Sequence, residues 1–202
     1  MEKKKEIFDI FPSPIFKYHI EDHKEINSDL SKHIYELKEK DPVGNTHSNA
    51  GGWHSKNFDI INEGPPKKFI FKFKDFLKSI VVEDYGWKYE EGKARIVAMW
   101  AIINKKDSFN IAHNHPNCFL SAAYYVKAPQ DCGNIQFYEP NEAKSIRYPK
   151  VEKYTKYSGS VVNFEPKEGD LLIFPSYLYH SVQANKSNED RIVISFNVDI
   201  YR

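Results

Sequence analysis

The sequence predicts a mostly β protein whose core is a curled or double-sheet structure with helices packed outside it. Two helical periodicities occupy the first half of the 202 residues, and from Ala94 onward the pattern changes to short strands. Aromatic residues make up 15% of the chain, which suits a β-rich core with large side chains. We expect a single domain over residues 1–202, with a helical lead-in at 1–93 and the strand-rich core at 94–202.

Each element follows from a local pattern. Apolar residues spaced by three and four predict one helix over about residues 22–40 and another over about 67–84. Residues 7–18 contain Pro12 and Pro14 and therefore predict an edge strand or a lead-in. The remaining strands are expected at 94–104, around the segment from Ile111 to Pro116, and at 119–126, 135–138, 160–164, 170–174, 179–182 and 191–200.

Composition narrows the function. A net charge of +1 implies no polyanion partner, so we expect no nucleic-acid binding. Cys118 and Cys132 form no CxxC pair, which fits a reducing compartment. No run approaches membrane-spanning length and residues 1–16 lack a signal-peptide core, so we expect a cytoplasmic protein without membrane contact. The oligomeric state stays open, a homodimer included.

The loop at residues 43–57 is rich in Gly, Asn and Ser and allows two interpretations. It is either a surface loop anchored by Trp53, or a lid that carries Trp53, His54 or Ser55 to the mouth of a site.

Three histidines of the strand-rich half form a candidate metal site. His113 and His115 are two residues apart, so an extended segment would present both imidazoles on one face. His180 follows the apolar strand that begins at Gly169-Asp170 and supplies a third imidazole. Such a set suits a borderline ion such as Fe(II), although the usual iron triad contains two histidines and one carboxylate.

Arg191 opens the last strand and is the candidate anion-binding residue. It shares a face with Val193, Ser195 and Asn197, while the alternate residues are apolar. An arginine inside a β core is costly unless a carboxylate meets it, and a dicarboxylate cosubstrate would supply one bidentately. The alternative is an exposed arginine paired with Glu189 or Asp190.

The chain resembles the 2-oxoglutarate- and Fe(II)-dependent dioxygenases in the segments HNHP, FLSAAYYV, NIQFYEP, GDLLIFPSYLYHSV and RIVISFN. It is closest to a poorly characterised, prolyl-hydroxylase-like subgroup with His-x-His-Pro where prolyl hydroxylases have His-x-Asp. FPSPIF and GGWHS also resemble that subgroup. The resemblance implies a double-stranded β-helix, or jelly roll, as in cupins.

The resemblance also implies roles for individual residues. His113, His115 and His180 match the metal positions, and Arg191 and Tyr125 match the residues that hold the C5 carboxylate of 2-oxoglutarate. Ser121 shares the face of Tyr125, and weaker candidates for the pocket are Asn104, Asn110 and Asn197. The implied activity is hydroxylation of a peptidyl side chain, an amino acid or a small metabolite, with release of succinate and CO2.

Two departures from the family leave alternatives open. His115 replaces a carboxylate, and Glu139 is a candidate substitute ligand, although a surface or supporting role fits it better. Val193 stands where many relatives have a serine. The rival interpretation is a cupin-type metal enzyme or binding protein without 2-oxoglutarate, because GDLLIFPSYLYH keeps most of a cupin motif. Residues 116–122 lack the cupin glutamate, however, and a metal-free binding module would leave the histidines unexplained.

Overall fold

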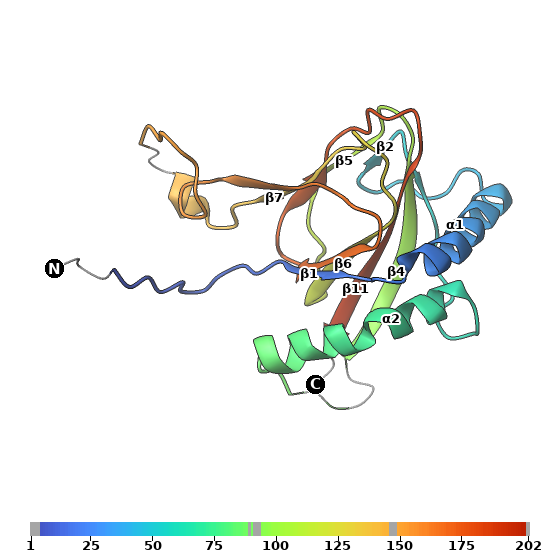
Figure 1. The fold of residues 1–202 in the computed structure, drawn as a ribbon, viewed down its shortest axis with the longest axis horizontal. Helices are drawn as coiled ribbons and strands as arrows, with labels where there is room; N and C mark the ends of the chain where they lie inside the picture. The colour runs from blue at the N-terminus through green and yellow to red at the C-terminus, as the bar shows by residue number, and fades with distance from the viewer. Residues whose placement is uncertain (1–4, 89, 91–93, 146–148, 201–202) are drawn as a thin grey trace.

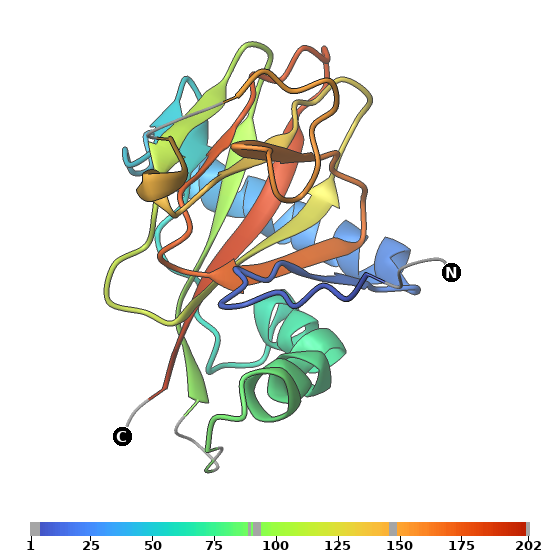
Figure 2. The ribbon, with the colours of Figure 1, turned by 90° about the vertical axis from the view of Figure 1, so that its left-hand side faces the viewer.

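The protein is described here by a computed structural model covering residues 5–88, 90, 94–145 and 149–200. Two antiparallel sheets form its core (Figures 1 and 2). The six-stranded sheet has the order β1 (Phe16–His19), β9 (Asp170–Pro175), β6 (Leu120–Lys127), β11 (Arg191–Ile200), β4 (Ala94–Asn104) and β3 (Trp53–His54). The five-stranded sheet has the order β2 (Asn49–Ala50), β5 (Phe109–His113), β10 (His180–Val182), β7 (Ile135–Tyr138) and β8 (Val161–Phe164).

The two helices cover the outer face of the larger sheet. These are α1 (His23–Lys40) and α2 (Pro65–Ser79), the latter continuing into a π-helical turn at Ile80–Asp84. Phe73 of α2 stacks on Phe196 of β11 with ring centroids 4.8 Å apart. The helical stripe thus buries its apolar side chains against the sheet, as its period predicts.

α1 is also fixed to the sheet by a buried polar link. The Asn27 side chain donates to the Val126 carbonyl at 2.9 Å and accepts from the Tyr124 hydroxyl at 2.6 Å. Because every group in this link is paired, its burial carries little penalty.

A second core lies between the sheets. Val193 of β11, Tyr125 of β6 and Phe174 of β9 pack there with Ile135 and Phe137 of the smaller sheet. On β11 the alternate residues, such as Ile194 and Phe196, join the outer core under the helices. The larger sheet is therefore apolar on both faces. Its outer face packs against the helices, and its inner face lies toward the smaller sheet.

The predicted fold class is confirmed. Both helices and the long strands occur close to their predicted bounds, with β4 and β7 as expected. The structure adds β2, β3 and a 3-10 turn at Glu142–Ser145, which the sequence did not indicate because two-residue strands carry no measurable period. Residues 7–15 form no regular structure, and only β1 remains of that predicted strand, at the edge of the sheet.

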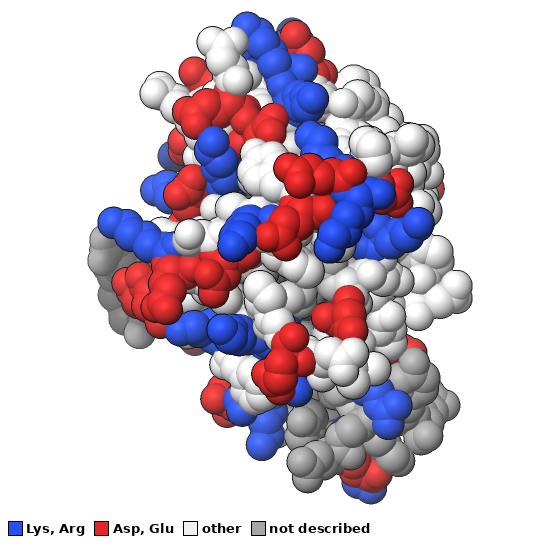
Figure 3. Space-filling view, turned by 90° about the vertical axis from the view of Figure 1, so that its right-hand side faces the viewer, with Lys and Arg blue, Asp and Glu red and all other residues white. Residues whose placement is uncertain are grey.

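The surface over α1 carries both signs of charge. Figure 3 shows the right-hand side of Figure 1, where the acidic and basic side chains of the described residues are interspersed without an extended patch of one sign. Among the described residues, no helix has the length and apolar character needed to cross a bilayer.

Candidate metal and cosubstrate site

Three imidazoles converge at one end of the smaller sheet. His113 ends β5 and His180 begins β10, and the two residues are directly opposite each other in this strand pair. His115 lies beyond the strand end, where its backbone N–H donates to the Ser176 carbonyl at 2.9 Å. One possible ligand atom from each ring lies within 4.8 Å of the others. The rings therefore meet as the sequence predicts, although a loop rather than an extended strand places His115.

Backbone carbonyls define the ring orientation of two of these histidines. The Nδ1 atoms of His113 and His180 lie 2.8 Å from the Ile111 carbonyl and 2.9 Å from the Leu178 carbonyl. A carbonyl can only accept, so both Nδ1 atoms carry the proton and both Nε2 atoms keep a free lone pair. This is the arrangement in which a second partner orients a metal-binding histidine.

Burial keeps the three imidazoles neutral. Desolvation lowers the pKa of His113, that of His115 to about 4 and that of His180 to about 3. The His113 imidazole lowers the pKa of the other two further, and a hydrogen bond with Asn197 raises that of His115. Neutral imidazole is the metal-binding form, so the site needs no deprotonation near pH 7.

The donor set fits a borderline divalent ion. Three neutral nitrogen ligands suit Fe(II), and among the described residues no carboxylate joins the group. Glu139, the candidate substitute ligand, instead pairs with Lys144 at 2.6 Å.

A pocket of about 790 Å³ connects the three histidines to Arg191. Arg191 is only 2% exposed. Its Nη1 donates to the carbonyls of Cys132 at 3.2 Å and Gly133 at 3.4 Å, while its Nε has no partner within the described structure. Neutral carbonyls do not compensate a buried guanidinium charge, so the site fits an entering carboxylate.

The other predicted pocket residues separate into two groups. Tyr125, Asn110 and Asn197 line the pocket, and burial raises the pKa of the Tyr125 phenol, which keeps it a hydrogen-bond donor. Ser121 and Asn104 lie outside the lining. The Ser121 hydroxyl donates to Asn197 at 3.0 Å, and the Asn104 amide donates to Asn110 at 3.0 Å, so each supports a lining residue instead.

Sequence reasoning missed the wall made by Trp100. Its indole stacks on His115 at 5.7 Å and 17° and on His54 at 5.5 Å and 14°. Trp100 alternates within β4 like a core residue, so its pattern alone could not reveal this role.

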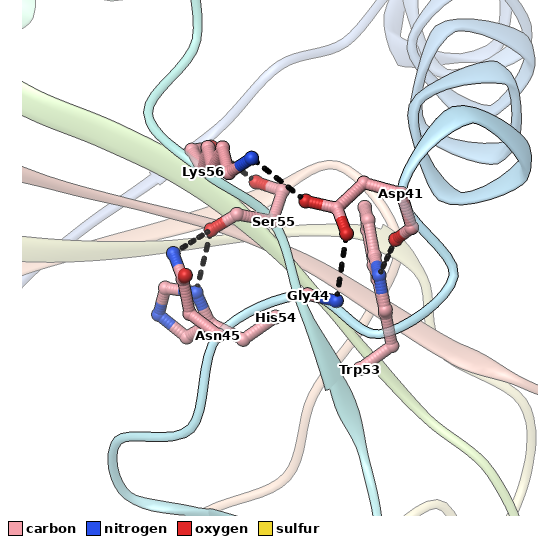
Figure 4. Close-up of polar contacts among 7 residues, drawn as sticks. All are labelled: Asp41, Gly44, Asn45, Trp53, His54, Ser55 and Lys56. Atoms are coloured by element: carbon pink, nitrogen blue, oxygen red, sulfur yellow. Dashed lines mark hydrogen bonds and ion pairs between the residues drawn. The ribbon is translucent and has the colours of Figure 1, made fainter.

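The 43–57 loop contributes to the same wall. Figure 4 shows Trp53 donating to the Asp41 carbonyl and His54 bonded through Nδ1 to the Ser55 carbonyl. Trp53 packs in the outer core, whereas His54 and Ser55 line the pocket. The loop is thus anchored as the surface interpretation predicts and also reaches the pocket; whether it moves as a lid stays a prediction.

A jelly roll that brings three imidazoles and a buried guanidinium to one pocket has the donors for a divalent metal and for a carboxylate. Residues 98–197 match the family described as "Putative 2OG-Fe(II) oxygenase", where 2OG is 2-oxoglutarate. Through this core the chain belongs to the 2OG-Fe(II) oxygenases, enzymes that depend on Fe(II) and 2-oxoglutarate.

Solved structures show the same fold. A prolyl-4-hydroxylase from Pseudomonas putida has a TM-score of 0.65 at 12% identity, covering 94% of each chain. HygX from Streptomyces hygroscopicus, with nickel and 2-oxoglutarate bound, has a TM-score of 0.64 at 11% identity, covering 93% of this chain and 83% of that one. A prolyl hydroxylase from Trichoplax adhaerens, in complex with a hypoxia inducible factor peptide, has a TM-score of 0.63 at 14% identity, covering 92% and 83%. No curated protein sequence matches the chain.

Proposed function

We propose that this chain is a hydroxylase in which His113, His115 and His180 hold Fe(II), while Arg191 and Tyr125 bind the C5 carboxylate of 2-oxoglutarate. The observation that carries the proposal is the buried Arg191 guanidinium, whose Nε lacks a partner in the described structure. A cupin site without 2-oxoglutarate gives no reason for an uncompensated cation in the pocket that holds the metal ligands. A dicarboxylate bound between them satisfies both.

The pocket residues would divide the work between binding and exclusion of water. Arg191 would neutralise the distal carboxylate, and the protonated Tyr125 would donate a hydrogen bond to it. Ala123, Phe174 and Val193 line this inner part and would keep water away from the cosubstrate. Low local dielectric strengthens the charge pair.

The overall reaction would convert R–H, 2-oxoglutarate and O2 into R–OH, succinate and CO2. Bound Fe(II) would supply the redox chemistry that couples oxidation of the two carbon substrates to reduction of O2. One oxygen atom enters the product alcohol and the other enters succinate, so atoms and electrons balance. The three neutral imidazoles would hold the ion at the wall of the pocket that also contains Arg191.

The chain would act as one domain on a small-molecule or peptidyl substrate. The pocket of about 790 Å³ has room for a substrate beyond the cosubstrate. Structural neighbours are recorded with a hypoxia inducible factor peptide and with hygromycin B, so this fold accommodates both kinds of ligand.

Anaerobic titration of the Fe(II) protein with 2-oxoglutarate tests the proposal. We expect a visible charge-transfer band on chelation, and succinate formation when O2 is admitted. Succinate added in place of 2-oxoglutarate is the matched control, because it lacks the 2-oxo group and cannot chelate in the same way. A metal-loaded protein with neither band nor succinate formation would favour the cupin-type alternative.

A further inference from the structure

We propose that the substrate of this pocket is an anion, a carboxylic acid or a similar oxyanion, with a flat group that lies along the wall of Trp100 and His54. The inference rests on the proposed function, because it counts the charges of the metal and 2-oxoglutarate.

The pocket lining contains no acidic side chain within the described part of the chain. Its charged residues are Lys56 and Arg191, and the rest are apolar, amide, hydroxyl or imidazole groups. A cationic substrate would therefore enter without a carboxylate partner, at a high desolvation cost.

The metal ligands leave one positive charge uncompensated. Arg191 would neutralise the distal carboxylate of 2-oxoglutarate, and the other carboxylate would cancel one of the two charges of a divalent metal. Because the three imidazoles are neutral, one positive charge remains at the metal. A carboxylate in the position of His115 would have cancelled it. Charges in a partly buried pocket are screened much less than charges at the surface, so this excess favours an anionic substrate.

Lys56 does not account for this preference. It lies at the rim with its side chain 77% exposed and pairs with Asp41 at 3.2 Å, as Figure 4 shows. An exposed pair of this kind contributes little. The excess charge lies deeper, beside the metal ligands.

The side chains of Trp100 and His54 would select the shape of the substrate and offer it polar contacts. The ring planes of His115, Trp100 and His54 are close to parallel, and all three residues line the pocket. The buried Trp100 N–H has no acceptor in the described structure, and an oxyanion would supply one. His54 donates a hydrogen bond from its Nδ1–H to the Ser55 carbonyl, so its Nε2 can accept one from a substrate N–H or O–H.

Three matched probes test the inference: hippurate, its neutral carboxamide, and N-(2-aminoethyl)benzamide, in which an amine replaces the carboxylate. All three share the flat ring and the amide N–H. Their dissociation constants would be measured by calorimetry on protein loaded with Zn(II) and 2-oxoglutarate, so the readout does not depend on turnover. We expect hippurate to bind at least tenfold more tightly than the carboxamide, and the amine to bind most weakly. Equal affinities, tighter binding of the amine, or binding of none of the three would overturn the inference.

Two variants locate the source of the preference. His115→Asp restores the negative charge and should reduce the preference for hippurate over the carboxamide below threefold. Lys56→Gln is the matched control for a rim charge and should leave it above fivefold. If 2-oxoglutarate itself fails to bind, the proposed function fails. If 2-oxoglutarate binds but the probes show no charge preference, only the present inference fails.

Discussion

Replacing Arg191 by methionine should have opposite effects on cosubstrate binding and on the stability of the empty protein. Methionine keeps an unbranched, flexible side chain that replaces the aliphatic part of arginine and removes the guanidinium with its charge. In the described structure only two carbonyl oxygens accept from the guanidinium, and its Nε has no partner. On the proposed function, the charge should therefore weaken the empty fold and strengthen the complex with a dicarboxylate.

The magnitude follows from the burial of the guanidinium. Breaking a buried charged pair by removing one partner costs about 3–5 kcal/mol, which corresponds to roughly two to four decades in affinity. The 2-oxoglutarate dissociation constant should therefore rise at least a hundredfold in Arg191→Met. Replacing buried charges by apolar side chains is commonly neutral or stabilising by about 1–4 kcal/mol, so the empty variant should be at least as stable as wild type.

Both quantities are measurable on the same preparations. Anaerobic titration of the Fe(II) protein gives the dissociation constant, and urea denaturation of the metal-free protein gives the free energy of unfolding. Arg191→Lys is the conservative control: it keeps a positive charge without the bidentate geometry and should bind with intermediate affinity. Normal 2-oxoglutarate binding by Arg191→Met would refute the reasoning and move the anchor to Lys56, the other cation of the pocket lining in the described structure. A loss of stability above 2 kcal/mol would show that the guanidinium is structurally required.

Three further predictions concern the rest of the site. His180→Ala should abolish Fe(II) binding in an equilibrium assay and leave the circular dichroism spectrum of the fold unchanged. His115→Asp should retain the metal and some activity, because it restores the commoner triad of two histidines and one carboxylate. Full metal affinity in His115→Ala would show that His115 is not a ligand. The pKa values of His115 and His180 fall to about 4 and about 3 in the fold, so below about pH 6.5 the unfolded chain binds more protons. The unfolding free energy of the metal-free protein should therefore decrease as the pH falls from about 6.5 to 4, by up to about 1.4 kcal/mol per pH unit for each imidazole, and His115→Gln should flatten this decrease in denaturation curves. Gly133→Ala should destabilise the fold by about 1–3 kcal/mol, because its Cβ would lie 2.4 Å from the Gln183 carbonyl oxygen and its φ is +85°. It should also weaken 2-oxoglutarate binding, because the Gly133 carbonyl accepts a hydrogen bond from Arg191. Wild-type stability in this variant would contradict that reasoning.

Periodicity was sufficient to predict the layers of the fold. The alternation along β11 placed Arg191, Val193, Ser195 and Asn197 on one face, and all four line the pocket. The apolar stripes of α1 and α2 likewise predicted which side of each helix would be buried. Such patterns are readable because burial imposes a regular period on the sequence.

The polar contacts of the site could not be predicted in the same way. Nothing in the sequence indicates that the carbonyls of Cys132 and Gly133 receive the Arg191 guanidinium, because any residue type carries a carbonyl. Likewise, Ser121 and Asn104 share strands with pocket residues, yet their side chains contact Asn197 and Asn110 instead of lining the pocket. Such contacts depend on the distances between elements, which are set by the packing of the whole core.

The same packing explains why the fold can keep an uncompensated charge. Arg191 begins the strand at the centre of the larger sheet, paired with β4 on one side and β6 on the other. Those neighbours hold the backbone in place, and the left-handed turn at Gly133 brings a carbonyl within 3.4 Å of the guanidinium. In the described structure the guanidinium is therefore buried, and its hydrogen-bond partners are carbonyl oxygens and not a carboxylate. In an oxygenase, an anionic cosubstrate that fills the inner pocket would pair with this buried cation and gain affinity from it. In a metal-binding module without such a ligand, the buried charge would only destabilise the fold.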